Sequence, residues 1–356
     1  MDYNITYRQK DKGWQYIISY KDSTGKWKQK SKQGFKNKKE AKPHAENALK
    51  LLKENQALNT DYDGITFKEF TEMYLDHISL HFENNTIRLY IMALKKFEPL
   101  YNLEVKKITT IHIQKCIDSM VKEDLSYGTI NTYLKKIKTL FNSAKNKYKI
   151  IPSSPIENIE IKVTKKPSKK KAISNEDLKI LLSKTTNPKY KVMFCLAGMC
   201  GLRFGEILGL KWNKIDFANN TIKIDLQWKN LSNNTVGFGE LKSQNSYRTV
   251  PMPPYVRKTL LEWKSLNPID ISNRVIVYNS CNGLHTLLSN YIRKLGYDLS
   301  LHELRHTYAT NLIAKGIDFK TVAKLMGHDI EETMKIYSHV TDDMMDNATN
   351  LINSMF

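Results

Sequence analysis

Five polar side chains in the second half of the chain could together bind and attack a phosphate. Arg203 stands in Gly-Leu-Arg-Phe-Gly-Glu, and His302 and Arg305 stand in His-Glu-Leu-Arg-His. His328 ends the run Leu-Met-Gly-His, and Tyr337 follows it nine residues later. Arginine offers a planar fork of N–H donors to phosphate oxygens, and a tyrosine hydroxyl can displace one ester of a phosphate to form a covalent link. This set predicts an enzyme that cuts DNA without using water.

The same motifs resemble, in the same order, those of the tyrosine recombinases, in particular the integrases of temperate phages and conjugative transposons. That family carries arginine in a Gly-Leu-Arg-x-x-Glu turn, a lysine in a β-hairpin, His-x-x-Arg, Leu-x-Gly-His and a nucleophilic tyrosine. The resemblance is strong from about residue 173 to about residue 345, and its one departure is Glu303, where the family often carries aspartate. It implies that Glu206 supports a catalytic set of Arg203, Lys242, His302, Arg305, His328 and the nucleophile Tyr337.

The resemblance also implies the reaction. The tyrosine forms a 3′-phosphotyrosyl link and releases a 5′-hydroxyl, which later attacks the partner strand, so that a mobile element is integrated or excised. The bond energy stays in the phosphotyrosine, and the family therefore needs no ATP, metal or other cofactor. The implied partners are double-stranded DNA with core and arm sites and a homotetramer in the synaptic complex. An excisionase and a host DNA-bending protein are further candidate partners.

Electrostatics supports the roles of the two arginines. The transition state gathers negative charge on the non-bridging phosphate oxygens, and fixed cations aimed there give a large stabilisation. Arg203 has apolar neighbours, among which an unpaired charge is costly, and Glu206 three residues later can orient it. His302 precedes Arg305 by three residues and should share its side of a helix, where it could exchange protons with the tyrosine. His306 is expected to point elsewhere.

Capping patterns predict where the last site residues lie. Gly327 is expected to end a helix, and Asp329-x-x-Glu332 is expected to cap the next one. Tyr337 should then lie on that helix, about two turns from its start.

Lys242 is the least constrained member of the set. It lies between Trp228 and a predicted strand from Thr249 to Met252. Glycines at 237 and 239 and nearby asparagines suggest flexible hairpin tips, from which a mobile lysine could reach the site. Its ammonium would protonate the departing 5′-oxygen.

Three other functions compete with this interpretation. Residues 302–306 match His-Glu-x-x-His, the helix motif of zinc proteases, with Glu331 as a conceivable third ligand. Against zinc, an arginine directly between the two histidines would repel a dication. A type IB topoisomerase would share the tyrosine chemistry, and a DNA-binding protein without catalysis would share the basic charge.

Composition points to a polyanionic partner and a reducing compartment. The 356 residues carry a net charge of +20 and are 41% hydrophobic, enough for more than one packed domain. Their four cysteines, at 116, 195, 200 and 281, form no C-x-x-C pair, which predicts buried reduced thiols. The longest uncharged apolar run, Val192 to Leu202, is too short to span a bilayer and predicts a buried helix. We expect a protein of the bacterial cytoplasm, associated with the nucleoid.

The pattern of elements predicts a multidomain α+β chain. Residues 1–58 should form a three-stranded sheet plus a helix, which in the family binds arm-type DNA, and residues 63–162 a four-helix domain for the core site. Residues 163–172 form a basic linker, and residues 173–356 a mainly α catalytic domain with a small antiparallel sheet. Capping boxes at Asn37-x-x-Glu40 and Thr66-x-x-Glu69, and a helix cap at Ser174-x-x-Asp177, support these boundaries.

Several lysines are candidate DNA contacts outside the catalytic set. They lie on the last helix of the core-site domain and in the linker: Lys135, Lys136, Lys138, Lys165, Lys166, Lys169, Lys170 and Lys171. In the N-terminal sheet, Trp14, Tyr16, Tyr20 and Trp27 alternate with lysines, which suits either DNA contact or a packed core. The C-terminal tail has Ala348, Leu351, Ile352 and Met355 at helical spacing, and this stripe would dock on its own domain or on a neighbouring protomer.

Overall fold

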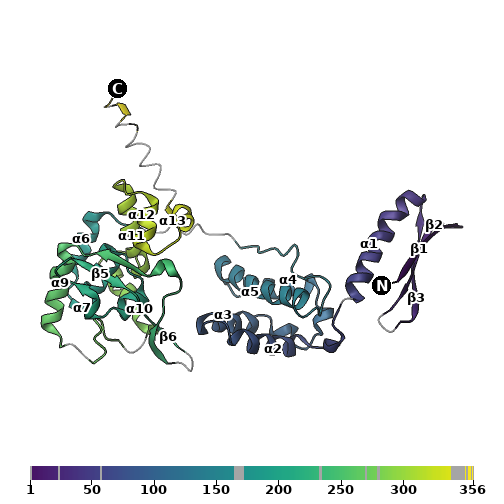
Figure 1. Ribbon diagram of the computed structural model, residues 1–356, viewed down its shortest axis with the longest axis horizontal. Helices are drawn as coiled ribbons and strands as arrows, with labels where there is room; N and C mark the ends of the chain where they lie inside the picture. Colours follow the sequence, from purple (N-terminus) through teal and green to yellow (C-terminus); the bar gives the residue numbers. More distant parts are fainter. Residues whose placement is uncertain are drawn as a thin grey trace. The chain divides into compact units, whose positions relative to one another are not determined.

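The computed structural model describes residues 2–22, 25–56, 58–163, 172–231, 235–268, 271–278 and 281–337, and four tail residues, 349, 352, 353 and 355 (Figure 1). The side chains of residues 54–56, 281–282 and 335–337 are not among the described parts. The chain divides into two compact units, Met1–Pro167 and Ser168–Phe356. Residues 164–171 of the predicted basic linker and most of the apolar tail lie outside the described residues.

The first unit begins with an antiparallel sheet of β1 (Tyr3–Lys10), β2 (Gly13–Lys21) and β3 (Trp27–Phe35), in that order. Helix α1 (Lys38–Gln56) follows, and its alanines and leucines pack against Tyr16 and Ile18 of the central strand. The predicted cap is present, because Asn37 Oδ1 accepts the Glu40 N–H at 2.8 Å. The prediction of three strands and one helix is confirmed.

The rest of this unit is helical, as the apolar periodicity predicts. Thr66 and Glu69 form the predicted capping box at the start of α2, and Phe67 stacks on Phe141 of the last helix with ring centroids 5.5 Å apart. The elements are η1 (Thr60–Tyr62), α2 (Phe67–Ser79), α3 (Asn84–Lys95), η2 (Glu98–Leu100), η3 (Val105–Lys107), α4 (Thr110–Lys122) and α5 (Tyr127–Asn146).

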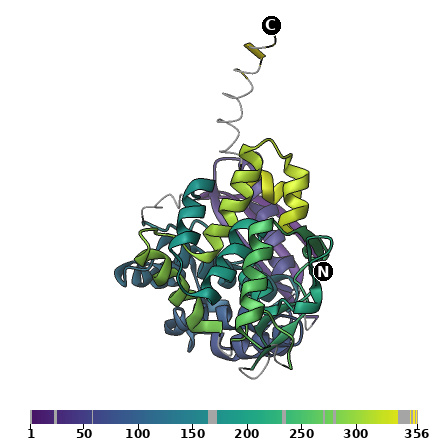
Figure 2. The same cartoon turned by 90° about the vertical axis from the view of Figure 1, so that its left-hand side faces the viewer.

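The second unit is mainly helical with small sheets, which confirms the predicted fold class; it faces the viewer in Figure 2. Its helices are α6 (Asn175–Lys184), α7 (Pro188–Cys200), α8 (Phe204–Gly209), α9 (Pro254–Leu266), α10 (Cys281–Lys294), α11 (Leu301–Ala314), α12 (Phe319–Met326) and α13 (Ile330–Tyr337). Its strands are β4 (Ile215–Asp216), β5 (Thr221–Ile224) and β8 (Arg248–Pro251) in one sheet, and β6 (Gln227–Asn230) and β7 (Val236–Gly239) in another. Short 3-10 turns are η4 (Trp212–Lys214) and η6 (Gln244–Ser246).

Helix α7 is the central element of this unit. From Val192 to Cys200 it is apolar on all sides, as expected for a buried helix, and it packs against α9 and α11. Burial raises the pKa of the Cys195 thiol to about 12, so this thiol stays protonated. Cys116, Cys195 and Cys200 are buried and unbridged. The prediction of a buried helix is confirmed, and these three cysteines are buried as predicted.

The β6–β7 hairpin differs from the sequence prediction. It is inserted between β5 and β8, which pair with each other. Gly237 and Gly239 lie inside β7 rather than at a hairpin tip, and Lys242 follows the hairpin instead of standing on it. The hairpin packs on α8 because Gly209 has no side chain: a Cβ there would come within 2.7 Å of the Gln227 backbone.

Aromatic and cationic side chains hold this hairpin. Trp228 and Phe238 meet edge to face with ring centroids 5.0 Å apart. The Arg274 guanidinium lies 3.7 Å from the centre of the Trp228 ring, and the Lys211 ammonium lies 4.2 Å from that of Phe238. Among the described residues, no helix is long and apolar enough to cross a membrane.

Candidate active site

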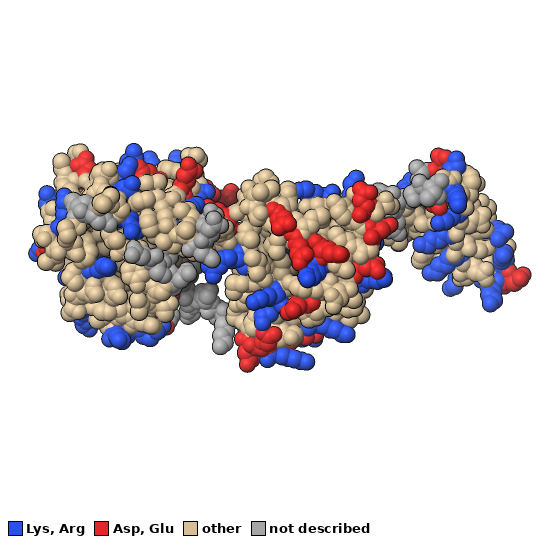
Figure 3. Space-filling view, turned by 90° about the horizontal axis from the view of Figure 1, so that it is seen from below, with Lys and Arg blue, Asp and Glu red and all other residues tan. Residues whose placement is uncertain are grey.

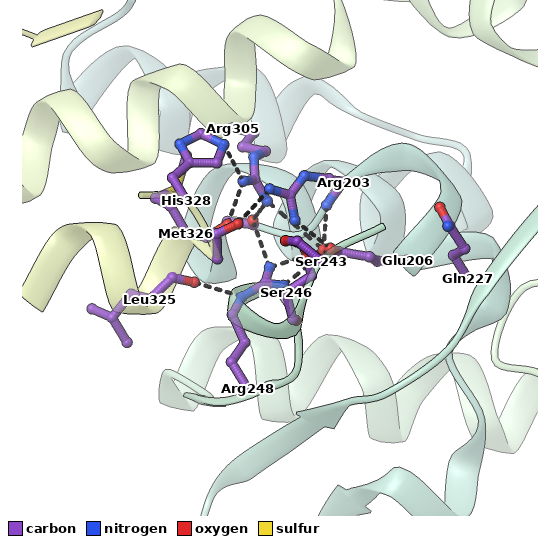
Figure 4. A network of polar contacts seen from close by, with 12 residues as sticks. Arg203, Glu206, Gln227, Ser243, Ser246, Arg248, Arg305, Leu325, Met326 and His328 are labelled. Carbon is purple, nitrogen blue, oxygen red and sulfur yellow. Dashed lines mark hydrogen bonds and ion pairs between the residues drawn. The ribbon is translucent and has the colours of Figure 1, made fainter. Parts of the chain in front are cut away.

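A single buried carboxylate organises the site. Glu206 on α8 is 2% exposed and faces three arginines from three parts of the chain (Figure 4). Arg203 Nη1 donates to Oε1 at 2.8 Å, and Arg248 donates to both carboxylate oxygens at 3.0 and 2.8 Å. Arg305 Nη1 lies 3.7 Å from Oε2. The predicted contact between Glu206 and Arg203 is therefore present, within a larger cluster.

The arginines keep this carboxylate ionised. Burial alone raises the pKa of Glu206, but the hydrogen bonds and charge of Arg248, and then the charges of Arg305 and Arg203, outweigh burial and lower the pKa to about 2. Three guanidinium groups around one carboxylate leave an excess of two positive charges. Such a cluster can stabilise the negative charge that a phosphate gathers in the transition state of a displacement reaction.

Arg203 is the arginine that reaches solvent. The chain turns at Gly201, in the left-handed region with φ 68°, and Arg203 then becomes the N-cap of α8. The Glu206 carboxylate also accepts the Arg203 backbone N–H at 2.8 Å, and Nη2 donates to the Gly327 carbonyl at 2.7 Å. The side chain nevertheless stays 33% exposed. It can therefore present part of its fork to a phosphate while the protein fixes its direction.

Arg305 is almost fully buried and connects α11 to two turns. Its Nη1 donates to the Gly201 carbonyl, and its Nη2 donates to the Met326 carbonyl at the end of α12. The same Nη2 lies 2.9 Å from Nε2 of His328. This arginine brings the start of α8 and the Leu-Met-Gly-His turn to one place, as the motif order predicts.

His328 is held as a neutral ring. Gly327 ends α12 with φ 62°, which confirms the predicted cap and directs the next residue towards Arg305. Burial, followed by the charges of Arg305 and Arg203, lowers the pKa of His328 to about 3. Because a guanidinium can only donate, Nε2 must accept, and the ring proton lies on Nδ1. That nitrogen is buried and has no hydrogen-bond partner among the described residues.

His302 lies on the exposed side of α11, one turn before Arg305. The expectation that His306 points elsewhere was wrong. Residues four apart on a helix are neighbours, and the two imidazoles meet edge to face with ring centroids 4.5 Å apart. His306 is buried, so it forms the inner wall against which the exposed His302 ring packs.

For Lys242 and Tyr337 the structure gives the position of the backbone, and no side-chain contact to the other site residues is described. Lys242 is exposed in the bend between β7 and η6, and the structure gives its ammonium no hydrogen bond or ion pair within the described residues. Tyr337 is the last residue of α13, two turns from its start as predicted. Its side chain lies outside the described parts. Asp329 is expected to cap α13, and its carboxylate accepts from the Asn245 amide.

Arg248 belongs to the cluster but was not predicted as a site residue. Its side chain is 2% exposed, and it reaches Glu206 from the first residue of β8. One pattern could have identified it: Arg248, Val250 and Met252 alternate along the strand and are all buried. A charged residue on the inner face of a strand requires a buried partner of opposite charge.

The zinc-protease alternative receives no support. Across the described residues, no three histidine, cysteine or acidic side chains are grouped so that they could hold a metal ion. His302 and His306 contact each other, but Glu331 does not join them as a ligand. The intervening Arg305 points into the Glu206 cluster.

The expected DNA-contacting lysines are only partly described. Lys135 and Lys138 are exposed on α5, whereas the Lys136 ammonium lies 4.8 Å from the centre of the Tyr90 ring. The candidates in the linker lie outside the described residues, and these are Lys165, Lys166, Lys169, Lys170 and Lys171. The three on α5 therefore remain available for a test, and two of them face solvent.

In the N-terminal sheet most of the predicted aromatics serve the core. Tyr16 is buried, Trp14 and Tyr20 pack partly against the same cluster, and Trp27 is 60% exposed. The opposite face of the sheet is polar. Strand register places Arg8 opposite Gln15, Gln15 opposite Gln33, and Ser19 opposite Gln29 on that face. Figure 3 shows basic side chains gathered on this N-terminal part, at the right of the view.

Three family models match the chain in order. The phage integrase family matches residues 171–344, the arm DNA-binding domain matches residues 5–52, and the N-terminal SAM-like domain of phage integrases matches residues 66–121. A tyrosine recombinase XerC-like protein of Caldanaerobacter subterraneus is 28% identical over 94% of both chains. The ICEBs1 integrase of Bacillus subtilis is 24% identical over 78% of this chain and 80% of its own.

Solved structures share the fold. The Tn1549 transposon integrase in complex with transposon right end DNA superposes with a TM-score of 0.67 at 20% identity, over 81% of this chain and all of that one. A lambda integrase tetramer bound to a Holliday junction gives a TM-score of 0.56 at 15% identity, over 91% and 95% of the two chains. The family models and the curated relatives favour a recombinase over the topoisomerase alternative. The chain belongs to the phage integrase family of tyrosine recombinases.

Proposed function

We propose that this recombinase integrates and excises a mobile element by cutting and rejoining DNA at specific sites. The observation that carries the proposal is the Glu206 cluster. It leaves an excess of positive charge with one arginine partly exposed, which suits a phosphodiester in the transition state of displacement. Beside it, the buried His328 Nδ1–H has no hydrogen-bond partner among the described residues. Mobile-element integrases stand among the relatives and the structural neighbours.

In the proposed cleavage step, the Tyr337 hydroxyl oxygen attacks the scissile phosphorus. The phosphorus–oxygen bond to the 5′ side breaks, and a 3′-phosphotyrosyl link forms. The Arg203 and Arg305 charges stabilise the non-bridging oxygens, and the His328 Nδ1–H donates to one of them. His302 takes the tyrosine proton, and Lys242 gives a proton to the departing 5′-oxygen. The reverse step, with a 5′-hydroxyl from the partner strand, rejoins the DNA.

The domains would divide the work of binding DNA. We assign arm sites to residues 1–58, the core site to residues 63–162 and 173–356, and the connection between them to residues 163–172. The polar open face of the N-terminal sheet, with Arg8, Gln29 and Gln33, suits the reading of base edges. Exposed Lys135 and Lys138 suit phosphate contacts.

Assembly and location follow from the same reaction. Exchange between two duplexes requires four active sites, and a lambda integrase neighbour is a tetramer on a Holliday junction. We therefore propose a homotetramer on DNA, assisted by an excisionase and a host DNA-bending protein, in the bacterial cytoplasm at the nucleoid. Its DNA target and the direction of the reaction would be set by sites that junction sequencing in cells can identify.

Covalent trapping tests the proposal most directly. In a core-site duplex with a nick beside the cleavage point, the short fragment between that point and the nick diffuses away after attack. Its 5′-hydroxyl is then missing for the reverse reaction, so the phosphotyrosyl link stays. The parent protein should give a slower band on a denaturing gel, and Tyr337→Phe should give none while it still shifts DNA under native conditions. Tyr308→Phe is the matched control, because Tyr308 is a buried tyrosine of the same unit. A covalent band with Tyr337→Phe would refute the assignment of the nucleophile.

A further inference from the structure

Arg248 is bound entirely by protein groups. It donates to both oxygens of Glu206, to the Ser246 carbonyl at 3.1 Å and to the Leu325 carbonyl at 2.7 Å. A further hydrogen bond, at 3.3 Å, reaches the Gly201 carbonyl. With 2% of its side chain exposed, it has no surface left for DNA. Its role must therefore act through other residues.

Its first effect is on charge. If Arg203 alone balanced Glu206, the pair would be neutral and would attract a phosphate weakly. Arg248 supplies the carboxylate with a counter-charge from inside the protein, at 2.8 and 3.0 Å. The charges of Arg203 and Arg305 then remain uncompensated towards the substrate, while the carboxylate still fixes the direction of Arg203.

Its second effect is on the segment that follows Lys242. Residues 243–248 pack against the turn that carries His328: a Cβ at Gly327 would lie 3.1 Å from Arg248 Nη1 and 3.1 Å from the Asn245 carbonyl. Asn245 also donates to Asp329, directly before α13. Arg248 anchors this segment at Ser246 and at the end of α12. The segment after Lys242 and the start of the tyrosine-bearing helix thus share one buried support.

We propose that Arg248 is a positioning residue for strand cleavage, which holds Glu206 as an ionised anchor for Arg203 and Arg305 and fixes the segment after Lys242 beside the His328 turn. The proposal rests on the phosphate-binding roles given above to Arg203 and Arg305. Arg248→Gln removes the charge and the bidentate fork but keeps a neutral amide N–H donor on a shorter side chain. It should slow cleavage by about a hundredfold, while DNA affinity changes less than about threefold.

A role limited to packing would slow cleavage equally at every pH, and this separates the two explanations. The charged groups that face Glu206 are Arg203 on its own element, Arg305 from α11 and Arg248 from β8. A small pocket beside it is lined by Lys211, Lys214, Lys223 and Asp225. Burial raises the pKa of Glu206 and the neighbouring cations lower it. Without Arg248 fewer cations remain, so the Glu206 carboxylate takes up a proton at a higher pH. A protonated anchor releases Arg203, and cleavage should acquire an additional fall on the acid side.

Single-turnover cleavage of nicked core-site DNA, measured from about pH 5 to about pH 9, tests this with the full chain. We expect the additional acid-side fall in Arg248→Gln and not in the parent. The double variant Arg248→Gln with Glu206→Gln should be slow but should lack this additional fall, because it has no carboxylate to protonate. Parental rates in Arg248→Gln, or an equal loss at every pH, would overturn the proposal.

Two further variants keep the test decisive. Arg248→Lys retains the buried charge but not the fork, so it should cleave slowly without the added acid-side fall; a parental rate would overturn the proposal even if Arg248→Gln does not fold. Arg203→Lys examines the proposed site itself. If Arg203→Lys is slow and Arg248→Gln is not, the positioning role alone fails; if Arg203→Lys cleaves normally, the proposed phosphate site fails.

Discussion

Arg305 donates to Nε2 of His328 at 2.9 Å, and this hydrogen bond determines which ring nitrogen carries the proton. Because the guanidinium cannot accept, the neutral ring must place its hydrogen on Nδ1. The histidine is therefore prepared to donate to an oxygen and unsuited to act as a base. In the proposed site that leaves His302, exposed on the same helix as Arg305, as the proton acceptor.

The depressed pKa of His328 predicts how folding depends on pH. The folded pKa is about 3 and the ordinary value is 6.5. Between these values the unfolded chain binds a proton that the folded chain does not, so this contribution to stability is complete above about pH 6.5 and is lost as pH falls towards 3. His328→Gln should make the thermal unfolding temperature less dependent on pH over this range. His285→Gln, an exposed histidine of the same unit, should leave the dependence as in the parent.

An unchanged pH dependence in His328→Gln would contradict the buried neutral ring. Glu206 contributes in a lower range, because its folded pKa is about 2 against an ordinary 4.5. Its contribution is present above about pH 4.5 and is lost as the pH falls through 2, so the two residues can be separated by the pH at which each loss begins.

Replacing Arg203 or Arg305 by lysine keeps the charge and removes the bidentate fork. Arg203→Lys should lower the single-turnover cleavage rate by about a hundredfold or more, with little change in DNA affinity or stability, because its side chain is partly exposed. Arg305→Lys should also destabilise the fold by about 2 kcal/mol or more, since its 1% exposed side chain supports two backbone carbonyls. Equal unfolding temperatures for the two variants would contradict this division of roles.

Lys242 is predicted to protonate the leaving oxygen, and a sulfur substrate can test this separately. When the bridging 5′-oxygen is replaced by sulfur, a thiolate leaves without needing a proton. Lys242→Ala should be severely slow on ordinary DNA and close to the parental rate on the sulfur substrate, whereas Arg203→Ala should be slow on both. Lys258→Ala, which changes an exposed lysine on α9, is the control and should cleave both normally. Equal defects of Lys242→Ala on the two substrates would make it a charge-stabilising or DNA-positioning residue.

The polar face of the N-terminal sheet predicts a separate binding defect. Replacing Arg8, Gln29 and Gln33 by alanine should weaken binding to arm-bearing DNA and leave cleavage of an isolated core site unchanged. Replacing Lys39 and Lys42, exposed on α1, should have a smaller effect on arm-site discrimination. For every phosphate that the variant no longer neutralises, the slope of log affinity against log salt should fall by about 0.9. If the α1 variants lose discrimination and the sheet variants do not, DNA binds to the helix side.

Much of the fold could be predicted because its determinants are local. The capping box at Thr66, the N-cap at Ser174 and the glycine at 327 each depend on residues close in sequence, and the structure contains all three. The β6–β7 hairpin was misjudged, because glycines inside a strand look the same in sequence as glycines in a turn. In the structure a Cβ at Gly237 would meet the Leu231 side chain and a Cβ at Gly239 the Lys229 side chain, so these two glycines leave room for side chains of the partner strand and the residue after it.

The candidate site divides in the same way. Arg203 and Glu206 are three residues apart, so local geometry alone brings them together. His302 is also three residues from Arg305, but it lies on the exposed side of α11 while Arg305 is buried. Arg248 meets Glu206 across 42 positions of sequence, and Arg203 meets the Gly327 carbonyl across 124. Such interactions exist only after α12 packs against β8. The roles assigned to Lys242 and Tyr337 remain predictions that the experiments above address.

The arginines of this site are held largely by main-chain carbonyls, those of residues 201, 325, 326 and 327. A carbonyl is present whatever side chain the residue bears, so positions 325 and 326 can diverge among variants provided that the helix still ends there. Gly201 and Gly327 cannot, because a Cβ at Gly201 would lie 2.6 Å from the Tyr308 ring and both glycines have positive φ. In a saturation library selected for recombination, we expect that no substitution is tolerated at Gly201 or Gly327, whereas substitutions at Leu325 are tolerated. What evolution must preserve at these supporting positions is the course of the backbone, because the carbonyls that hold the arginines do not depend on the side chains there.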